Sequence, residues 1–273
     1  MKGTAFVLSG GGSHGAVQVG MARALLEAGI RPEALYGTSI GAVNAAALAQ
    51  GFDRSTVDSL AARWAEFARL PPLRPSVRAL VSAVMRRSPG LFSMPSARER
   101  LGANLSYRNI EDAPIDLGIA ATNLMTGEEH LFRTGPVVDT LMASCAVPGF
   151  FPPVEIDGEY YVDGLLYGAP VHQAVEAGHR DIYLLLTSPP APLVEVPVTW
   201  WSIARRAATI IMCRQLTDSA RQRATTVRIH TVPSVPTLRG ISRRRFDHSA
   251  ELIAESHRVV GAWLRSHRET GAR

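Results

Sequence analysis

A short glycine-flanked segment contains the first residue that could do chemistry. Residues 37–41 read GTSIG and match the pattern G-x-S-x-G around Ser39. Gly37 and Gly41 would let a strand turn sharply into a helix, which leaves the serine in a strained backbone conformation with its hydroxyl projecting. We therefore take Ser39 as a candidate nucleophile. The alternative is a tight turn with a structural serine.

A second segment, residues 10–15, reads GGGSHG and fits two kinds of anion site. Gly10, Gly12 and Gly15 have the GxGxxG spacing of a dinucleotide-binding loop. A run of glycines also lets backbone N–H groups approach a reacting oxygen closely. A dinucleotide site requires an acidic residue at the end of the second strand, where this sequence has GTSIG instead. A nucleotide-dependent oxidoreductase is therefore disfavoured.

A serine nucleophile needs a base and an oxyanion hole. Asp163 ends the run YYVDG at the end of an expected strand, directly before Gly164. Asp157 also precedes a glycine, but it lies in an expected hairpin turn and is interpreted as structural. Histidines that follow Ser39 have ordinary surface or strand surroundings, and none has a clear claim to be the base. These histidines are His172, His179, His230, His248, His257 and His267.

Strands and helices alternate along the chain, which predicts an α/β fold with a mostly parallel central sheet. Ligand loops of such sheets lie at the carboxyl ends of the strands. Apolar runs predict strands at 4–9, 33–39, 115–124, 128–133, 181–188 and 227–233, and a hairpin at 153–164. Helical spacing of apolar residues predicts helices at 16–29, 40–51, 137–147, 170–179 and 246–264.

Composition indicates a soluble globular protein. The 273 residues are 46% hydrophobic and 19% charged, without a linker that divides them, so we expect one domain over 1–273. No apolar run approaches the roughly 18 residues of a membrane span, and the N-terminus does not resemble a signal peptide. We expect a cytoplasmic location, with Cys145 and Cys213 as buried filler and neither a cofactor nor a metal.

The net charge of +5 comes almost wholly from arginine, since Lys2 is the only lysine, and three short arginine clusters do not form a nucleic-acid-binding stripe. Two clusters lie beside apolar residues, at 76–87 and 200–212. These segments could form a lid or contact a membrane surface, although amphipathic helices packed on the core are the more common outcome. We expect excursions from the sheet near 71–100 and 189–216, and peripheral membrane contact is a further expectation.

Five motifs in order resemble those of patatin-like phospholipases. They are GGGSHG, GTSIGA, AATNLMTGEEHLF, ASCAVPGFFPPVEIDG and YYVDG, spanning residues 4 to about 190. The resemblance implies an α/β/α three-layer sandwich and a lipid acyl hydrolase with Ser39 as nucleophile and Asp163 as its general base. It implies that backbone N–H groups of the glycine loop form an oxyanion hole. The N–H of Ile40, the residue after the candidate nucleophile, is a further candidate donor to the oxyanion. The residues concerned are Gly10, Gly11, Gly12 and Ile40, with His14, Gly15, Gly37, Gly41 and Gly164 as supporting motif positions.

Two departures from the family pattern concern the surroundings of the site. His14 stands where the family usually has Arg or Lys, and Leu165 stands where it usually has a second glycine. Neither departure touches the two reacting side chains. The expected substrate is a lipid or other acyl ester. An acyltransferase that uses the same dyad, or a catalytically weak lipid-binding regulatory protein, remains the alternative.

Overall fold

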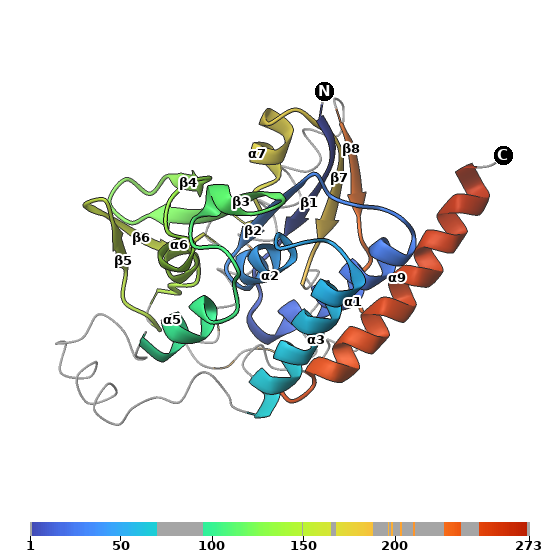
Figure 1. Cartoon of the computed structure of the whole chain (residues 1–273), viewed down its shortest axis with the longest axis horizontal. Coiled ribbons are helices and arrows are strands. Elements are labelled where there is room, and N and C mark those ends of the chain that lie inside the picture. The colour runs from blue at the N-terminus through green and yellow to red at the C-terminus, as the bar shows by residue number, and fades with distance from the viewer. Residues whose placement is uncertain are drawn as a thin grey trace.

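The chain is described as a computed structural model that covers residues 2–69, 95–148, 150–164, 168–187, 227–235 and 246–271, with isolated positions between 196 and 210. Its centre is an eight-stranded mixed sheet flanked by helices (Figure 1). The predicted α/β class is therefore confirmed. The expected excursions lie mostly outside the described residues, at 71–100 and 189–216. Both amphipathic segments belong to these ranges.

The sheet has the strand order β5-β6-β3-β2-β1-β7-β8, and β4 pairs with β3. Strands β1, β2, β3, β7 and β8 pair in parallel, whereas the pairs of β3 with β4, β3 with β6, and β5 with β6 are antiparallel. The bounds are β1 (Lys2–Leu8), β2 (Ala34–Thr38), β3 (Asp116–Asn123), β4 (Glu129–Phe132), β5 (Val154–Ile156), β6 (Glu159–Asp163), β7 (His179–Leu185) and β8 (Arg228–Thr231).

Alternate residues of the central strands face two separate apolar layers, as the period of a strand requires. Phe6 and Leu8 of β1 join the larger core, which is completed by residues of α1, α2, α3 and α9. Ala5 and Val7 point to a smaller core that contains residues of α7. Helices therefore cover both faces of the sheet.

The described helical elements include the five predicted helices and two further helices, at 54–69 and 95–102, that were not predicted. They are α1 (Ala16–Glu27), α2 (Ile40–Leu48), α3 (Arg54–Arg69), α5 (Pro95–Gly102), α6 (Val137–Ser144), α7 (Val171–Glu176) and α9 (Ser249–Gly271), with short 3₁₀ turns η1 (Gly12–Gly15) and η2 (Ile110–Asp112). Helix α1 ends where expected: Gly29 has a φ of 77°, and the N–H of Ile30 donates to the carbonyl oxygen of Leu25 at 2.9 Å.

The β5–β6 hairpin forms around the two residues expected to make its turn. Asp157 and Gly158 have φ values of 53° and 81°, which match a turn that needs positive φ at both central positions. Asp157 is therefore structural, as predicted. Strand β6 of this hairpin ends at Asp163, the candidate base.

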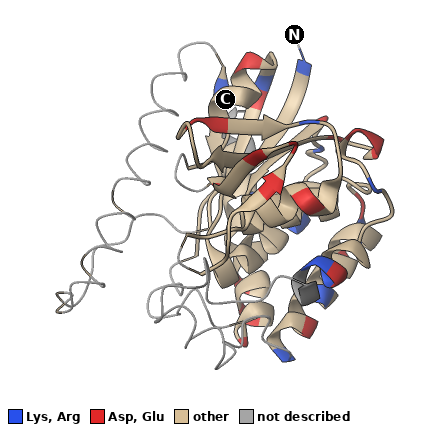
Figure 2. Cartoon of the chain, turned by 90° about the vertical axis from the view of Figure 1, so that its left-hand side faces the viewer, with Lys and Arg blue, Asp and Glu red and all other residues tan. Residues whose placement is uncertain are grey.

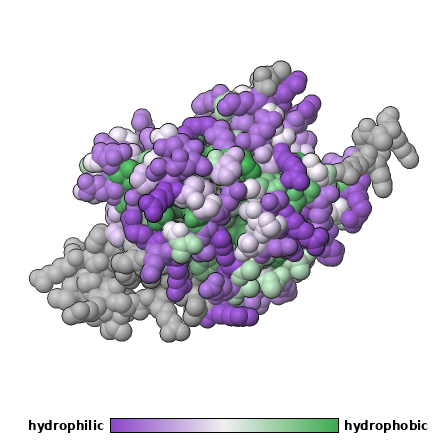
Figure 3. All heavy atoms as spheres, in the orientation of Figure 1, coloured by the Kyte–Doolittle hydropathy of each residue, from purple (hydrophilic) through white to green (hydrophobic). Residues whose placement is uncertain are grey.

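Charges of both signs are interspersed over the described elements in Figure 2. On the face shown in Figure 3, hydrophobic residues are visible mainly in recesses among hydrophilic ones. Among the described helices, none has the length and apolar composition needed to cross a membrane.

Candidate active site

Ser39 occupies the turn between β2 and α2, as the G-x-S-x-G pattern predicts. Its φ of 55° and ψ of −129° lie outside the regions that side chains favour, which costs about 1–3 kcal/mol. Gly37 and Gly41 make the turn possible. A Cβ on Gly37 would lie 2.5 Å from Cα of Ala42, and one on Gly41 would collide with the carbonyl oxygen of Leu8. The flanking glycines thus have the steric purpose inferred from the sequence.

Asp163 reaches Ser39 because β2 and β6 meet end to end along one edge of β3. Thr38 of β2 pairs with Ala120 in a parallel ladder, and Asp163 of β6 pairs with Ala121 in an antiparallel ladder. Strand β4 pairs with both alanines from the other edge, which leaves β2 and β6 on the same edge. The two strands run toward one another, so the residues at their ends come together.

The Ser39 hydroxyl donates a hydrogen bond to Oδ2 of Asp163 at 2.6 Å. Both residues are buried, with exposed fractions of 7% and 2%. The Asp163 backbone is also held, because its N–H donates to the Ala146 carbonyl oxygen at 3.0 Å and its own carbonyl accepts from Thr122 Oγ1 at 3.2 Å. Ser39 precedes the first residue of α2, where the helix dipole favours negative charge.

The glycine loop after β1 packs against the start of α2. A Cβ on Gly15 would lie 2.8 Å from Cγ1 of Ile40, and one on Gly41 would lie 2.6 Å from the carbonyl oxygen of Ser9. These close approaches bring the loop next to the turn that holds Ser39. His14 lies within the 3₁₀ turn of this loop and is 5% exposed.

The carbonyl oxygen of Gly10 in this loop is engaged, whereas nearby backbone N–H groups have no partner among the described residues. Thr187 Oγ1 donates to the carbonyl oxygen of Gly10 at 2.5 Å. Within the described part of the chain, the N–H groups of Gly11, Gly12 and Ile40 donate to no other residue. Donors of this kind suit a developing oxyanion.

A buried polar network connects the glycine loop to α2 and was not predicted from the sequence. The Asn44 amide donates to the carbonyl oxygen of Gly15 at 2.9 Å and to Gln18 Oε1 at 2.8 Å. Gln18 in turn donates to the carbonyl oxygen of Ser9 at 2.8 Å. Trp64 Nε1 donates to Asn44 Oδ1 at 3.0 Å. Both ends of the loop are therefore fixed relative to the helix that begins after Ser39.

Ser144, at the end of α6, holds the backbone of the candidate nucleophile. Its Oγ accepts a hydrogen bond from the Ser39 N–H at 2.8 Å and donates to the Ala120 carbonyl oxygen at 2.6 Å. The side chain is fully buried. Sequence reasoning included Ser144 in the ASCAVPG motif but assigned it no role; a buried polar residue at the end of an apolar helix was the available signal.

Cys145 also lies at this site, which corrects its interpretation as buried filler. The residue is half-buried. Desolvation raises the pKa of its thiol, the nearby Asp163 carboxylate raises it further, and a hydrogen bond with Ser39 opposes the rise. The thiol therefore stays protonated and is a poor nucleophile. Cys213 and Leu165 lie outside the described residues.

The glycine after Asp163 is required by the close approach of β3. A Cβ on Gly164 would lie 2.5 Å from the carbonyl oxygen of Ala120, which also accepts the hydrogen bond from Ser144.

Over the described ranges, no three His, Cys, Asp or Glu side chains gather in a way that could hold a metal ion.

Histidines that follow Ser39 contact partners away from it. The pairs are His172 with Glu129, His179 with Tyr36, His230 with Asp181, His248 with Glu251, His257 with Glu27, and His267 with Trp263.

The fold and the site define the class of protein: an α/β protein whose candidate active site pairs a serine in a strained turn between a strand and a helix with a buried aspartate. The model of the patatin-like phospholipase family matches residues 6–175, and the chain belongs to this family.

Two curated relatives illustrate the range of proteins that share this region. The chain is 33% identical over 160 residues to the patatin-like phospholipase domain-containing protein ZK370.4 of Caenorhabditis elegans, covering 58% of this chain and 11% of that protein. It is 31% identical over 175 residues to the uncharacterized NTE family protein Rv2565 of Mycobacterium tuberculosis, covering 61% of this chain and 27% of that protein. The chain thus spans a minor part of the length of these relatives.

Among solved structures, VipD from Legionella pneumophila is similar at 13% sequence identity with a TM-score of 0.45, covering 97% of this chain and 67% of that chain.

Proposed function

We propose that the protein is a serine lipid acyl hydrolase that cleaves fatty acyl esters through Ser39 and Asp163. The observation that carries the proposal is the 2.6 Å hydrogen bond from the strained, buried Ser39 to the Asp163 carboxylate. Membership of the patatin-like phospholipase family supports a lipid ester as substrate.

In the acylation step, Ser39 Oγ attacks the ester carbonyl carbon while Asp163 takes the hydroxyl proton. The carbonyl oxygen becomes an oxyanion, which the N–H groups of Gly11, Gly12 and Ile40 would bind. Each such donor contributes about 3 kcal/mol to transition-state stabilisation. The carbon–oxygen bond to the alcohol then breaks, and Asp163 gives its proton to that alcohol.

Deacylation repeats the same steps with water. Asp163 removes a proton from a water molecule that attacks the acyl-serine carbonyl. When the second oxyanion collapses, the bond from the carbonyl carbon to Ser39 Oγ breaks, Asp163 gives its proton to that oxygen, and the fatty acid leaves. An alcohol in place of water would accept the acyl group instead, so transacylation uses the same residues.

Turnover of acyl esters by the purified protein tests the proposal. We expect hydrolysis of 4-nitrophenyl esters and of phospholipid in mixed micelles, lost in both Ser39→Ala and Asp163→Asn. Adding glycerol as acceptor separates the two reactions, because a transacylase would form acylglycerol at the expense of free fatty acid. Vesicle binding without turnover of any ester by the native protein would contradict the proposal and support a lipid-binding protein.

A further inference from the structure

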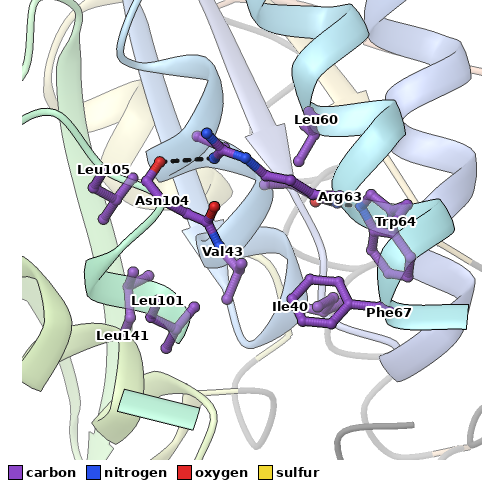
Figure 4. A pocket seen from close by; sticks show the side chains of 12 residues that line it. Ile40, Val43, Leu60, Arg63, Trp64, Phe67, Leu101, Asn104, Leu105 and Leu141 are labelled. Carbon is purple, nitrogen blue, oxygen red and sulfur yellow. Dashed lines mark hydrogen bonds between the residues drawn. The ribbon is translucent and has the colours of Figure 1, made fainter. Parts of the chain in front are cut away.

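An apolar slot runs along α2 from Ile40, the residue that follows Ser39 in the chain (Figure 4). The slot is narrow, with a cavity volume of about 30 Å³. Ile40, Val43, Asn44 and Ala47 line it from α2, and this spacing places them on one face of the helix over about two turns. The first of them is the residue directly after the candidate nucleophile.

The walls of the slot suit a hydrocarbon. Ile40, Val43, Leu101 and Leu105 pack against the core with part of each side chain still accessible. The Asn44 side chain also lines the slot, but its amide already bonds with the buried network described above. A polar ligand would find few unused partners along these walls, whereas a methylene chain would bury apolar surface on both sides.

A hydrogen bond between two lining residues crosses the end of the slot away from Ile40. Arg63 donates to the carbonyl oxygen of Asn104 at 2.7 Å, the dashed line in Figure 4. Gln50, one turn beyond the last lining residue of α2, donates to the same oxygen at 3.3 Å. In Figure 4, Ile40 and Phe67 lie at the opposite end from this bond.

The distance between the two ends is set by α2. Seven residues separate Ile40 from Ala47, which corresponds to about 10.5 Å at 1.5 Å per residue. A C–C bond of about 1.5 Å with an angle near 111° advances an extended chain by about 1.25 Å per carbon. The length of the slot along α2 therefore corresponds to about eight carbons of an extended chain.

We propose that this slot binds the acyl chain of the substrate and that Arg63, hydrogen-bonded to Asn104, limits its length to about eight carbons. The inference rests on the proposed hydrolase function and narrows its substrate class to esters of medium-chain acids. A longer chain would have to displace a charged guanidinium from its carbonyl partner or leave its terminal carbons in water. Either outcome weakens transition-state binding, which lowers kcat/KM.

Hydrolysis of 4-nitrophenyl esters with 4, 8, 12 and 16 acyl carbons, below their aggregation concentrations, tests this limit. For the native protein we expect kcat/KM to peak at 8 carbons and to fall about tenfold by 12 carbons, an effect of the size that one or a few misplaced methylenes produce. Arg63→Ala should raise the ratio of 12-carbon to 8-carbon activity about tenfold. Gln50 still occupies the Asn104 carbonyl in this variant, which favours folding.

Val43→Phe fills the middle of the slot and should move the optimum to 4 carbons. Arg54→Ala is the matched control for Arg63→Ala. Arg54 also lies on α3, but its side chain is 93% exposed and lies outside the slot. An activity that rises steadily to 16 carbons in the native protein, or a length profile that is the same in all four proteins, would overturn the slot assignment while leaving the hydrolase proposal intact.

Binding to an inactive variant separates the slot from the chemistry. Octanoate should raise the melting temperature of Ser39→Ala, and the additional change Val43→Phe should remove that rise. An equal rise in both variants would overturn the slot assignment. A different outcome would separate the two proposals. If the native protein turned over no ester, but octanoate bound Ser39→Ala and not the double variant with Val43→Phe, the hydrolase proposal would be contradicted and the acyl-binding slot would stand.

Discussion

Strand β2 contributes to two polar clusters that differ in kind. Toward the amino ends of the parallel strands, the Tyr36 hydroxyl lies 3.3 Å from His179 Nε2 and accepts a hydrogen bond from Arg133 at 3.2 Å. Arg133 also donates to both carboxylate oxygens of Asp116, at 2.7 and 2.6 Å. At the carboxyl end of the same strand, the hydroxyl of Ser39 contacts the carboxylate of Asp163.

The difference lies in the backbone and in the available donors. Ser39 and Asp157 are the two described non-glycine residues with positive φ, and neither belongs to the Tyr36 cluster. The Ser39 site also has backbone N–H groups without partners among the described residues. Burial of titratable groups is therefore common to both clusters, whereas strain and open donors occur at one. Removing a side-chain hydroxyl from each cluster separately should lower mainly activity at the Ser39 end of β2 and mainly stability at the Tyr36 end.

The largest expected effect comes from the strained turn. In Gly41→Ala the new methyl group would collide with the carbonyl oxygen of Leu8, so we expect a loss of about 3 kcal/mol in the free energy of unfolding and loss of activity. Gly261→Ala is the control. It lies inside α9 with its nearest neighbouring atom 3.5 Å from the added Cβ, and should gain about 0.5–1 kcal/mol. Urea unfolding measures both, and equal effects would argue against a sterically required turn.

The next effect concerns Ser144, the residue that holds the backbone of the candidate nucleophile. Ser144→Ala removes the acceptor for the Ser39 N–H, and we expect kcat to fall about 10- to 100-fold with little change in KM. Ser256→Ala removes a hydroxyl that is equally buried and bonds to the carbonyl oxygen of Val17 at 2.8 Å. Steady-state kinetics should show full activity in that control. A similar loss of kcat in both variants would indicate general destabilisation instead.

Tyr36→Phe tests the other cluster. Removing the hydroxyl leaves the buried His179 without that partner, and we expect a loss of about 1–2 kcal/mol in the free energy of unfolding. The value of kcat should stay within about twofold of the native one, since the cluster makes no contact with Ser39. Urea titration and an ester assay on the same preparation measure the two effects. A large fall in kcat with unchanged stability would break the distinction between the clusters.

The smallest effect is a pH dependence of stability. Burial lowers the pKa of His179, so the folded protein keeps the neutral imidazole below the unfolded value of about 6.5. Between the lowered pKa and about 6.5 the unfolded chain binds the extra proton, and stability therefore falls as pH falls through this window. The contribution of His179 to the free energy of unfolding is present in full above about pH 6.5.

His179→Gln should flatten this dependence by about 1 kcal/mol between pH 7.5 and 5.5, as measured by urea unfolding at both values. The pKa of His130 is also lowered by burial. Its contribution is common to both proteins and cancels in the comparison. An unchanged slope in the variant would show that His179 does not titrate differently in the two states.

The turn around Ser39 could be predicted from the sequence because the information for it is local. Gly37, Ser39 and Gly41 lie within five residues, and the steric need for the glycines follows from the turn itself. The order of strands and helices was equally local, since each depends on apolar spacing and on stops such as Gly29. The family motifs then allowed Asp163 to be paired with Ser39 across 124 residues.

Contacts between distant elements could not be predicted in the same way. The meeting of β2 with the antiparallel β6 along one edge of β3 depends on sheet pairing, which periodicity does not specify. Ser144 and Cys145 reach the site because α6 ends there, and no spacing rule links them to Ser39. The slot likewise combines side chains from four helices, so its end at Arg63 was not foreseen.

Covalent labelling with a fluorophosphonate is the most direct test of the central claim that Ser39, activated by Asp163, is the nucleophile. Intact mass and peptide mapping should show one adduct on Ser39 in the native protein, none in Ser39→Ala, and labelling at least about 100-fold slower in Asp163→Asn. An adduct on another residue, or equal labelling rates in Asp163→Asn and the native protein, would contradict the account.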